Sequence, residues 1–184
     1  MKPNVLLITS DQLRVYELGC YDPSNVIAGK PNSPNIDGLA SEGTRFEYAF
    51  TSSPFCTPAR ASLYSGQYVR RCMGSVINAP EPVVERDIFP DQILPELLRD
   101  AGYKTALIGK WHLHTRPEQV GFDHCIYPEA YHVNFDQKYH IGEKFRKVLG
   151  PAYDFELSEA ETYIHAQGDD PFFLNFNGRE CACK

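Results

Sequence analysis

The sequence predicts an α/β fold in which a mostly parallel sheet is flanked by helices. Two runs, the continuous apolar one at residues 4–9 and the largely apolar one at 103–108, have the length and composition of buried strands. Each run ends abruptly in polar or charged residues, and open α/β sheets bind their ligands beyond the carboxyl ends of their strands. Between the two runs, leucines recur at helical spacing. These three observations favour a sheet with a ligand site along one edge.

Composition fits a globular domain and excludes several functional classes. The chain has 184 residues, of which 42% are hydrophobic and 12% aromatic, enough for one buried core. A net charge of −6, without any block rich in lysine and arginine, argues against binding to nucleic acid or to a membrane surface. An anionic substrate would therefore have to be held by local positive charge.

Nothing in the chain indicates a membrane span or a targeting segment. No apolar run approaches the ~20 residues needed to cross a bilayer, and the first residues lack the order of a signal peptide. We expect a cytoplasmic protein as given, or a periplasmic or secreted one if a signal has been removed. Without repeats or low-complexity linkers, residues 1–184 are predicted to form a single α/β unit.

The six cysteines are too sparse and irregular for a disulfide scaffold, so free thiols are predicted. Cys181 and Cys183 lie close together but lack a second ligand pair at zinc-site spacing. They are interpreted as part of a solvent-exposed tail.

The run at residues 4–9 is typical of a central strand covered on both faces. Asp11 and Gln12 follow it directly, and a carboxylate beside an amide oxygen suits a hard cation such as Ca²⁺ or Mg²⁺. Such a pair is more often only a turn or a helix cap. Further on, residues 33–43 form a predicted helix, with Ser33 as N-cap and Gly43 as the stop, and the alternation over 44–50 predicts a strand.

Residues 55–66 are the stretch around which the chain is organised. Pro58 fits the first turn of a helix, which places Cys56 at the helix N-terminus, where backbone N–H groups and the dipole favour an anion. Arg60 follows one turn later and would share a face with Cys56. The alternative is a small buried cysteine capping an ordinary helix. Arg70 and Arg71, further along, are interpreted as a solvated pair.

The second cluster of chemistry follows the second apolar run. A helix over 94–101, closed by Gly102, leads into the strand at 103–108. If the next residues are extended, Lys110 and His112 point to the same side, which puts a cation beside a group that titrates near neutral pH.

The last third of the chain carries weaker signals. Residues 127–147 are polar and aromatic and are assigned to no element, and His132 and His140 are predicted to be surface or core residues rather than pocket residues. A capping box at residues 158–161 predicts a helix to about residue 167, and an aromatic-rich strand is predicted at 171–176.

Two of these segments resemble the signatures of one enzyme family. Cys-Thr-Pro-Ala-Arg at 56–60, followed by Ala-Ser-Leu-Tyr-Ser-Gly, resembles the first signature of the formylglycine-dependent sulfatases, members of the alkaline-phosphatase-like superfamily. Gly-Tyr-Lys-Thr-Ala-Leu-Ile-Gly-Lys-Trp-His-Leu at 102–113 resembles the second. The resemblance covers nearly the whole chain but only the first part of the family's catalytic domain, so we expect an alkaline-phosphatase-like sheet that is incomplete at its C-terminal end.

The resemblance implies a set of catalytic residues. In the family a maturase oxidises the cysteine at position 56 to formylglycine, whose hydrate is the nucleophile. The lysine matching Lys110 contacts the sulfate and the formylglycine, and the histidine matching His112 hydrogen-bonds the formylglycine hydroxyl. With Arg60 beside the nucleophile, the expected catalytic residues are Cys56, Arg60, Lys110 and His112.

The resemblance also implies a metal site. Asp11 matches the first acidic ligand of the family, whereas Gln12 stands where many members have a second aspartate. We therefore expect Asp11, Gln12 and residue 56 to form half of a Ca²⁺ or Mg²⁺ site. The family's other metal ligands, an Asp-Asn or Asp-His pair, are not found in this chain.

The function implied is hydrolysis of a sulfate ester on a small molecule or a glycan. The Asp-Gln pair is also similar to that of choline-sulfatase and phosphonate-monoester-hydrolase relatives, so a phosphonate monoester hydrolase or phosphodiesterase is an alternative. A third reading is a sulfatase fragment without catalysis.

Overall fold

The computed structural model describes residues 2–21, 33–73, 89 and 91–178. Their contacts divide them into two compact units: residues 2–9 with 51–178, and residues within 10–50. Each unit is described by itself, and the organisation of the chain as one α/β domain stays a prediction. Within the described part, no helix is long and apolar enough to cross a membrane.

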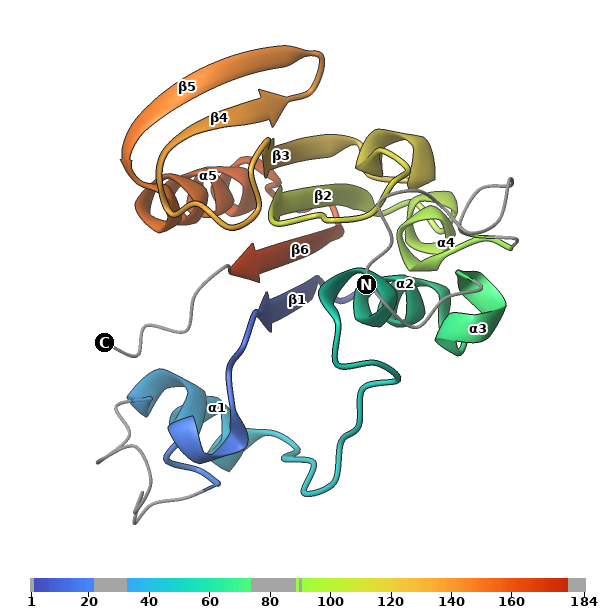
Figure 1. Cartoon of the computed structure of the whole chain (residues 1–184), viewed down its shortest axis with the longest axis vertical. Helices are drawn as coiled ribbons and strands as arrows, with labels where there is room; N and C mark the ends of the chain where they lie inside the picture. The colour runs from blue at the N-terminus through green and yellow to red at the C-terminus, as the bar shows by residue number, and fades with distance from the viewer. Residues whose placement is uncertain (1, 22–32, 74–88, 90, 179–184) are drawn as a thin grey trace. The chain divides into compact units, whose positions relative to one another are not determined.

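A sheet of six described strands, in the order β1-β6-β2-β3-β4-β5, forms the framework of the first unit (Figure 1). β2 pairs in parallel with both β6 and β3, and β4 and β5 add an antiparallel hairpin. The predicted α/β class with a mostly parallel sheet is confirmed. The strands are β1 (Val5–Ser10), β2 (Lys104–Gly109), β3 (His124–Pro128), β4 (Phe135–Ile141), β5 (Lys144–Pro151) and β6 (Phe172–Gly178).

Both faces of β2 are buried, which explains why its sequence is apolar without alternation. Ala106 and Ile108 join one core, to which α5 (Ala152–Ala166) contributes. Leu107 joins the other core, with residues of α2 (Cys56–Ser65) and α4 (Leu94–Asp100).

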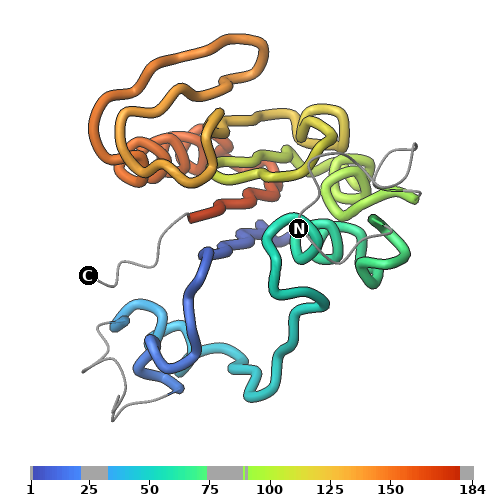
Figure 2. The backbone as a smooth tube through the Cα atoms, in the orientation of Figure 1, coloured from blue at the N-terminus to red at the C-terminus, as the bar shows by residue number. Residues whose placement is uncertain are grey.

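β2 and β6 lie side by side although the chain makes a long excursion between them (Figure 2). Their register pairs Gly109 with Asn177, and the Lys110 N–H donates to the carbonyl of Asn177 (3.2 Å). The predicted strand at 171–176 is thus confirmed. It holds the segment that follows β2 from one side.

The position predicted for the first strand is wrong. β1 is not a central strand but lies at the end of the described sheet, next to β6 alone. Leu6 and Ile8 are 48% and 60% exposed, because every second side chain of β1 lies on a face that the described residues leave uncovered.

The strand predicted at 44–50 is also wrong, since this segment belongs to none of the described strands. Phe46, Tyr48 and Phe50 are strongly exposed. Alternation brings apolar residues to one side of an extended chain, but a strand also needs a neighbour that accepts its backbone hydrogen bonds.

The predicted helix at 33–43 is confirmed as α1 (Pro34–Glu42), with Ser33 as N-cap residue and Gly43 as C-cap residue. The Ser33 hydroxyl contacts Asp37 and the Gly19 N–H rather than an N–H of the first turn. The remaining helices are short: α3 (Val69–Cys72) and the 3₁₀ turns η1 (Val15–Glu17) and η2 (Pro117–Val120). Arg70 and Arg71, on α3, are exposed, as predicted.

The helix predicted at 94–101 is confirmed as α4, but its buried face is narrower than its leucine spacing indicates. Leu94 and Leu98 pack against the core, whereas Leu97 is 51% exposed.

The helix predicted at 158–167 begins six residues earlier, at Ala152, directly after β5 ends at Pro151. The capping box at Ser158 is therefore wrong. Ser158 lies inside α5, where its carbonyl accepts a hydrogen bond from the Thr162 hydroxyl (2.8 Å). Ser-x-x-Glu also occurs inside helices, where packing rather than the local motif decides the start.

Residues 127–147, left unassigned from the sequence, hold the end of β3, all of β4 and half of β5. Here His140 is half-buried and lies between two rings, Tyr127 at 4.6 Å and Phe145 at 4.4 Å between centroids. Burial lowers the pKa of His140. A cross-strand ring stack explains this histidine without a catalytic role.

We predict that Gly109→Ala destabilises the protein by more than ~2 kcal/mol, because it combines backbone strain with a clash. Gly109 has φ +100°, and a Cβ there would lie 2.3 Å from the carbonyl oxygen of Asn177 in the paired strand. Gly142→Ala is the matched control: φ is +56° but a Cβ would meet nothing within 4 Å, so we expect the loss of only about 1 kcal/mol. Urea unfolding measures both. Equal losses would show that contact with Asn177 is unimportant.

Candidate functional site

Cys56 is the first residue of α2, so its predicted place at a helix N-terminus is confirmed. Phe55 is the extended N-cap residue, and Gly66 ends the ten-residue helix in the left-handed conformation. The Thr57 hydroxyl donates to the backbone carbonyl of His112 (3.0 Å). This bond ties the beginning of α2 to the segment that follows β2.

Lys110 reaches Cys56 from the end of β2. Its Nζ atom donates to Cys56 Sγ across 3.6 Å, and the residue is entirely buried, with 0% exposure. Burying an ammonium group is costly unless its charge is compensated, so a buried lysine beside a nucleophilic side chain indicates a place built for negative charge.

Arg60, within α2, adds a second cation to the site that Cys56 and Lys110 form. We call this group of three residues the Cys56 corner. Arg60 is only 6% exposed, and its Nη1 atom donates to the carbonyl oxygen of Lys110 (2.9 Å). The Arg60 side chain thus binds the backbone of Lys110, and Lys110 in turn reaches the first residue of α2. Helix N-termini and buried cations both favour anions, so this corner is suited to bind a sulfate-like or phosphate-like group.

His112 lies close to this corner, but not in the predicted extended conformation. Its φ is +58°, in the left-handed region, so Lys110 and His112 do not follow the simple alternation of a strand. Its ring packs against Tyr131 at 4.8 Å between centroids and meets His132 edge-on at 5.5 Å. A strained histidine held by neighbouring rings is typical of functional sites.

Tyr131 is the residue of this region that sequence reasoning missed. It is half-buried between β3 and β4, and burial raises the pKa of its hydroxyl while the His112 backbone and the Arg60 charge oppose the shift. His132 is exposed, as predicted, but it contacts the ring of His112. No local pattern marks either residue, because their proximity depends on the return of the chain after β3.

Asp11 and Gln12 form a turn directly after β1 and belong to the second unit, whereas Cys56 belongs to the first. The metal site that they are predicted to share with residue 56 therefore stays a prediction. Their chemistry fits it: carboxylate and amide oxygens are hard donors, and Gln12 has φ +62° at the carboxyl end of a strand. Among the described residues, no three His, Cys, Asp or Glu side chains gather in one place.

Four cysteines, Cys20, Cys56, Cys72 and Cys125, are free thiols, as predicted, and Cys181 and Cys183 lie outside the described residues. Cys72 and Cys125 are buried, and burial raises the pKa of the Cys125 thiol well above its usual range. Cys56 differs from these two in being half-buried and beside a cation.

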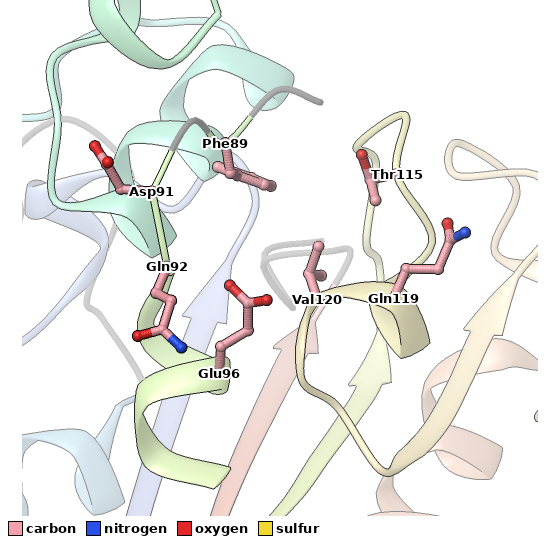
Figure 3. A pocket seen from close by; sticks show the side chains of 7 residues that line it. All are labelled: Phe89, Asp91, Gln92, Glu96, Thr115, Gln119 and Val120. Carbon is pink, nitrogen blue, oxygen red and sulfur yellow. The ribbon is translucent and has the colours of Figure 1, made fainter. Parts of the chain in front are cut away.

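A separate cavity of about 290 Å³ lies beside α4 and η2 (Figure 3). Its carboxylates have partners: Glu96 accepts from the Ile93 N–H, and Asp91 accepts from Gln67. None of the predicted site residues lines it. The lining residues are Phe89, Asp91, Gln92, Glu96, Thr115, Gln119 and Val120.

Comparison with known proteins gives a consistent family. The model of the Sulfatase family matches residues 3–176. The pig N-acetylgalactosamine-6-sulfatase is 37% identical over 134 residues, which cover 66% of this chain and 24% of that protein. An uncharacterised sulfatase of Escherichia coli K12 is 42% identical over 113 residues, covering 61% and 20%. The chain thus spans about a quarter of the length of these relatives.

Solved structures agree with the fold. A protein whose structure was solved in complex with its substrate, D-glucosamine-2-N,6-O-disulfate, matches with a TM-score of 0.82 and 27% identity over 97% of this chain and 34% of its own. The phosphonate monoester hydrolase of Agrobacterium radiobacter matches with a TM-score of 0.63 and 22% identity, over 96% and 40%, which is a likeness of fold alone.

We predict that the positive electrostatic potential around the Cys56 sulfur depends on Lys110. The measurement compares alkylation of unmodified Cys56 by iodoacetate, an anion, with alkylation by neutral iodoacetamide, read by peptide mass spectrometry. In Lys110→Met the rate ratio should fall about tenfold, since a unit charge next to the thiol is lost. Lys104→Met, at the opposite end of β2, is the matched control and should leave the ratio unchanged. An unaltered ratio in Lys110→Met would contradict the electropositive corner.

Proposed function

This chain belongs to the sulfatase family, and from this premise we propose that it supplies the nucleophile side of the active site of a sulfuric ester hydrolase. One observation carries the proposal: Lys110 Nζ lies 3.6 Å from Cys56 Sγ, while Arg60 binds the Lys110 carbonyl. A nucleophile position and two buried cations at one helix N-terminus match the demands of attack on a sulfate ester.

The nucleophile we propose is formylglycine, made from Cys56 by a maturase. The complete motif at 56–60 supports this, as does the placement of the cysteine at the start of α2. Cys56 Sγ then stands where the hydroxyl oxygens of the hydrated aldehyde would lie. Lys110, donating to the sulfur, would donate to one of those oxygens.

In the proposed reaction, one hydroxyl of the hydrate loses its proton and attacks the sulfur of the ester. The bond between sulfur and the alcohol oxygen breaks, and the alcohol leaves with a proton. The second hydroxyl then loses its proton and re-forms the aldehyde as the bond to sulfate breaks. A serine or cysteine lacks this second hydroxyl, which explains the modification.

The cations of the Cys56 corner have different roles in the proposed reaction. Lys110 and the N-terminus of α2 face the group attached to residue 56 and would hold the charge that develops on the sulfuryl oxygens. Arg60, fixed against the Lys110 backbone, keeps a second positive charge in the same corner. His112 would hydrogen-bond a hydroxyl at residue 56, as the resemblance implies.

Asp11 and Gln12 would hold the divalent cation, Ca²⁺ or Mg²⁺, together with residue 56. When bound, such a cation polarises a sulfuryl oxygen and favours ionisation of the nucleophile. What supports the assignment is the donor set at the end of β1, one carboxylate and one amide oxygen. The amide brings one negative charge fewer than a second aspartate would.

The substrate class we propose is a sulfated glycan or small molecule. The pig relative is named for an amino-sugar sulfate, a human relative that is 38% identical over 120 residues is named steryl-sulfatase, and one structural neighbour holds a sulfated glucosamine. Tyr131 and His132, beside His112, offer ring surfaces next to the corner. In this proposal these rings would contact the leaving alcohol.

A phosphonate monoester hydrolase or phosphodiesterase is the second candidate. It is favoured by Gln12, which stands where many sulfatases have an aspartate. The two candidate functions can be distinguished with residues 1–184 alone. The anion that fits the Cys56 corner should protect unmodified Cys56 from alkylation by iodoacetamide. Protection by sulfate at lower concentration than by phosphate or phenylphosphonate supports the sulfatase, and the reverse order supports the alternative.

We predict that Cys56 becomes formylglycine when the chain is produced together with a maturase. Mass spectrometry of the peptide that contains residues 56–60 should show the aldehyde, which Cys56→Ser or an omitted maturase should abolish in this cysteine-dependent pathway. A maturase substrate of known sequence serves as positive control. An unmodified thiol at 56 alongside a converted control would contradict the proposal.

We also predict that residues 1–184 alone have no sulfatase turnover above a Cys56→Ala control, even when formylglycine is present. A hard cation takes six or more oxygen ligands, and Asp11, Gln12, residue 56 and one substrate oxygen leave its shell largely to water. A loosely held cation would not fix the ester for in-line attack. Aryl sulfate hydrolysis with added Ca²⁺ or Mg²⁺ measures this. Metal-dependent turnover would contradict it and would direct attention to His132 and His140.

A further inference from the structure

Three polar side chains lie inside the aromatic core behind the Cys56 corner: Tyr64 of α2 and Asn175 and Asn177 of β6. Tyr64 is 1% exposed, and both asparagines are fully buried. The ring of Tyr64 packs against Trp111 at 4.9 Å between centroids. Buried polar groups destabilise a core unless they are hydrogen-bonded to one another, so such a group needs an explanation.

The three side chains form one hydrogen-bonded group. The side-chain amides of Asn175 and Asn177 both donate to the hydroxyl oxygen of Tyr64, the latter at 3.3 Å. The Thr9 hydroxyl donates to the Asn177 side-chain carbonyl. Burial raises the pKa of the Tyr64 hydroxyl, with the Arg60 charge and both amides opposing the shift, so the phenol is protonated at neutral pH.

This group is connected directly to the backbone of Lys110. The Asn177 amide donates to the Lys110 carbonyl oxygen (2.9 Å), and Arg60 Nη1 donates to the same oxygen (2.9 Å). In the other direction, the Lys110 N–H donates to the Asn177 carbonyl. Both peptide groups flanking the Lys110 Cα atom are thereby held, which fixes the direction in which the lysine side chain leaves the backbone.

The helix brings the same elements together from its own side. Cys56, Arg60 and Tyr64 follow at intervals of four residues and so lie along one face of α2. Cys56 is at the open end of this face, Arg60 in the middle and Tyr64 at the buried end. The Tyr64 ring packs on Trp111, the residue between Lys110 and His112.

We infer that Tyr64, acting through Asn177, is a positioning residue that aims the two cations, Lys110 and Arg60, at residue 56. The inference rests on the proposed function for its purpose, but its geometry does not depend on sulfate chemistry. The Tyr64 hydroxyl is hydrogen-bonded to the Arg60 side chain directly. Its effect on Lys110 passes through Asn177 and the Lys110 carbonyl, where the helix face and the end of β2 meet.

The chain offers a matched control for the removal of a buried hydroxyl. Tyr139 is as buried as Tyr64, and its hydroxyl bonds to the buried carboxyl group of Glu156 (2.8 Å). It lies in the core on the other face of the sheet, with α5. Tyr139→Phe therefore removes the same atom at a similar cost in packing, without touching the Lys110 backbone.

The experiment uses chain 1–184 produced without a maturase, so that residue 56 is a thiol. The readout is the ratio of the alkylation rates of Cys56 by iodoacetate and by iodoacetamide. Tyr64→Phe should lower this ratio at least about threefold, since a shift of a charge by a few ångströms within a poorly screened site changes the local potential by this order. Tyr139→Phe should leave the ratio at the wild-type value.

Urea unfolding accompanies each variant, so that misfolding is recognised. Asn177→Ser provides a second route: it removes the amide that joins Tyr64 to Lys110 and should lower the ratio at least as far as Tyr64→Phe. If either variant is folded and keeps the wild-type ratio, the inference is overturned. An equal fall in Tyr139→Phe would also overturn it, because the effect would then reflect general loosening of the core.

Failure of this inference and failure of the proposed function give different results. The alkylation ratio requires neither formylglycine nor turnover, so it can fall in Tyr64→Phe even if the chain is never converted by a maturase. Conversely, Cys56 could be converted to formylglycine while Tyr64→Phe leaves the alkylation ratio unchanged. That result would agree with the proposed function and would show that Tyr64 does not position the two cations.

Discussion

The carbonyl oxygen of Lys110 is the atom on which the arrangement of the site depends. It accepts hydrogen bonds from Arg60 on α2 and from Asn177 on β6, so a helix and two adjacent strands meet there. The lysine side chain leaves from this fixed point and reaches Cys56 across 3.6 Å. A buried ammonium group is tolerated only where its surroundings are equally fixed, because a flexible site would admit water or lose the compensating groups.

The pairing of β2 with β6 fixes the position of Lys110. β2 is covered on both faces, and its in-register pairing with β6 brings Gly109 against Asn177, where the backbones approach too closely for a side chain. The positive φ of Gly109 lets the chain turn out of the strand there, and Lys110 is the next residue. The proposed catalytic residues thus follow directly after the last paired residue of β2, at the carboxyl end of a parallel strand.

The described site brings together Cys56, the proposed nucleophile position, and two buried cations, Lys110 and Arg60. The family match covers residues 3–176, and the chain spans about a quarter of the length of its relatives. The divalent cation, the maturase and the sulfated substrate enter as proposals, supported by the donor set of Asp11 and Gln12, by the motif at 56–60 and by the names of the relatives.

The sequence by itself determined the features whose causes are local. Pro58 marks the first turn of α2, the spacing of Cys56 and Arg60 places both on a common face, and the segment before Lys110 is identified as a buried strand. Only the tertiary structure decided the edge position of β1, the early start of α5, the failure of residues 44–50 to form a strand and the contacts of Tyr64, Asn177 and Tyr131. These features depend on which distant segment lies alongside, and neither hydrophobic period nor capping residues encode a neighbour that is a hundred residues away.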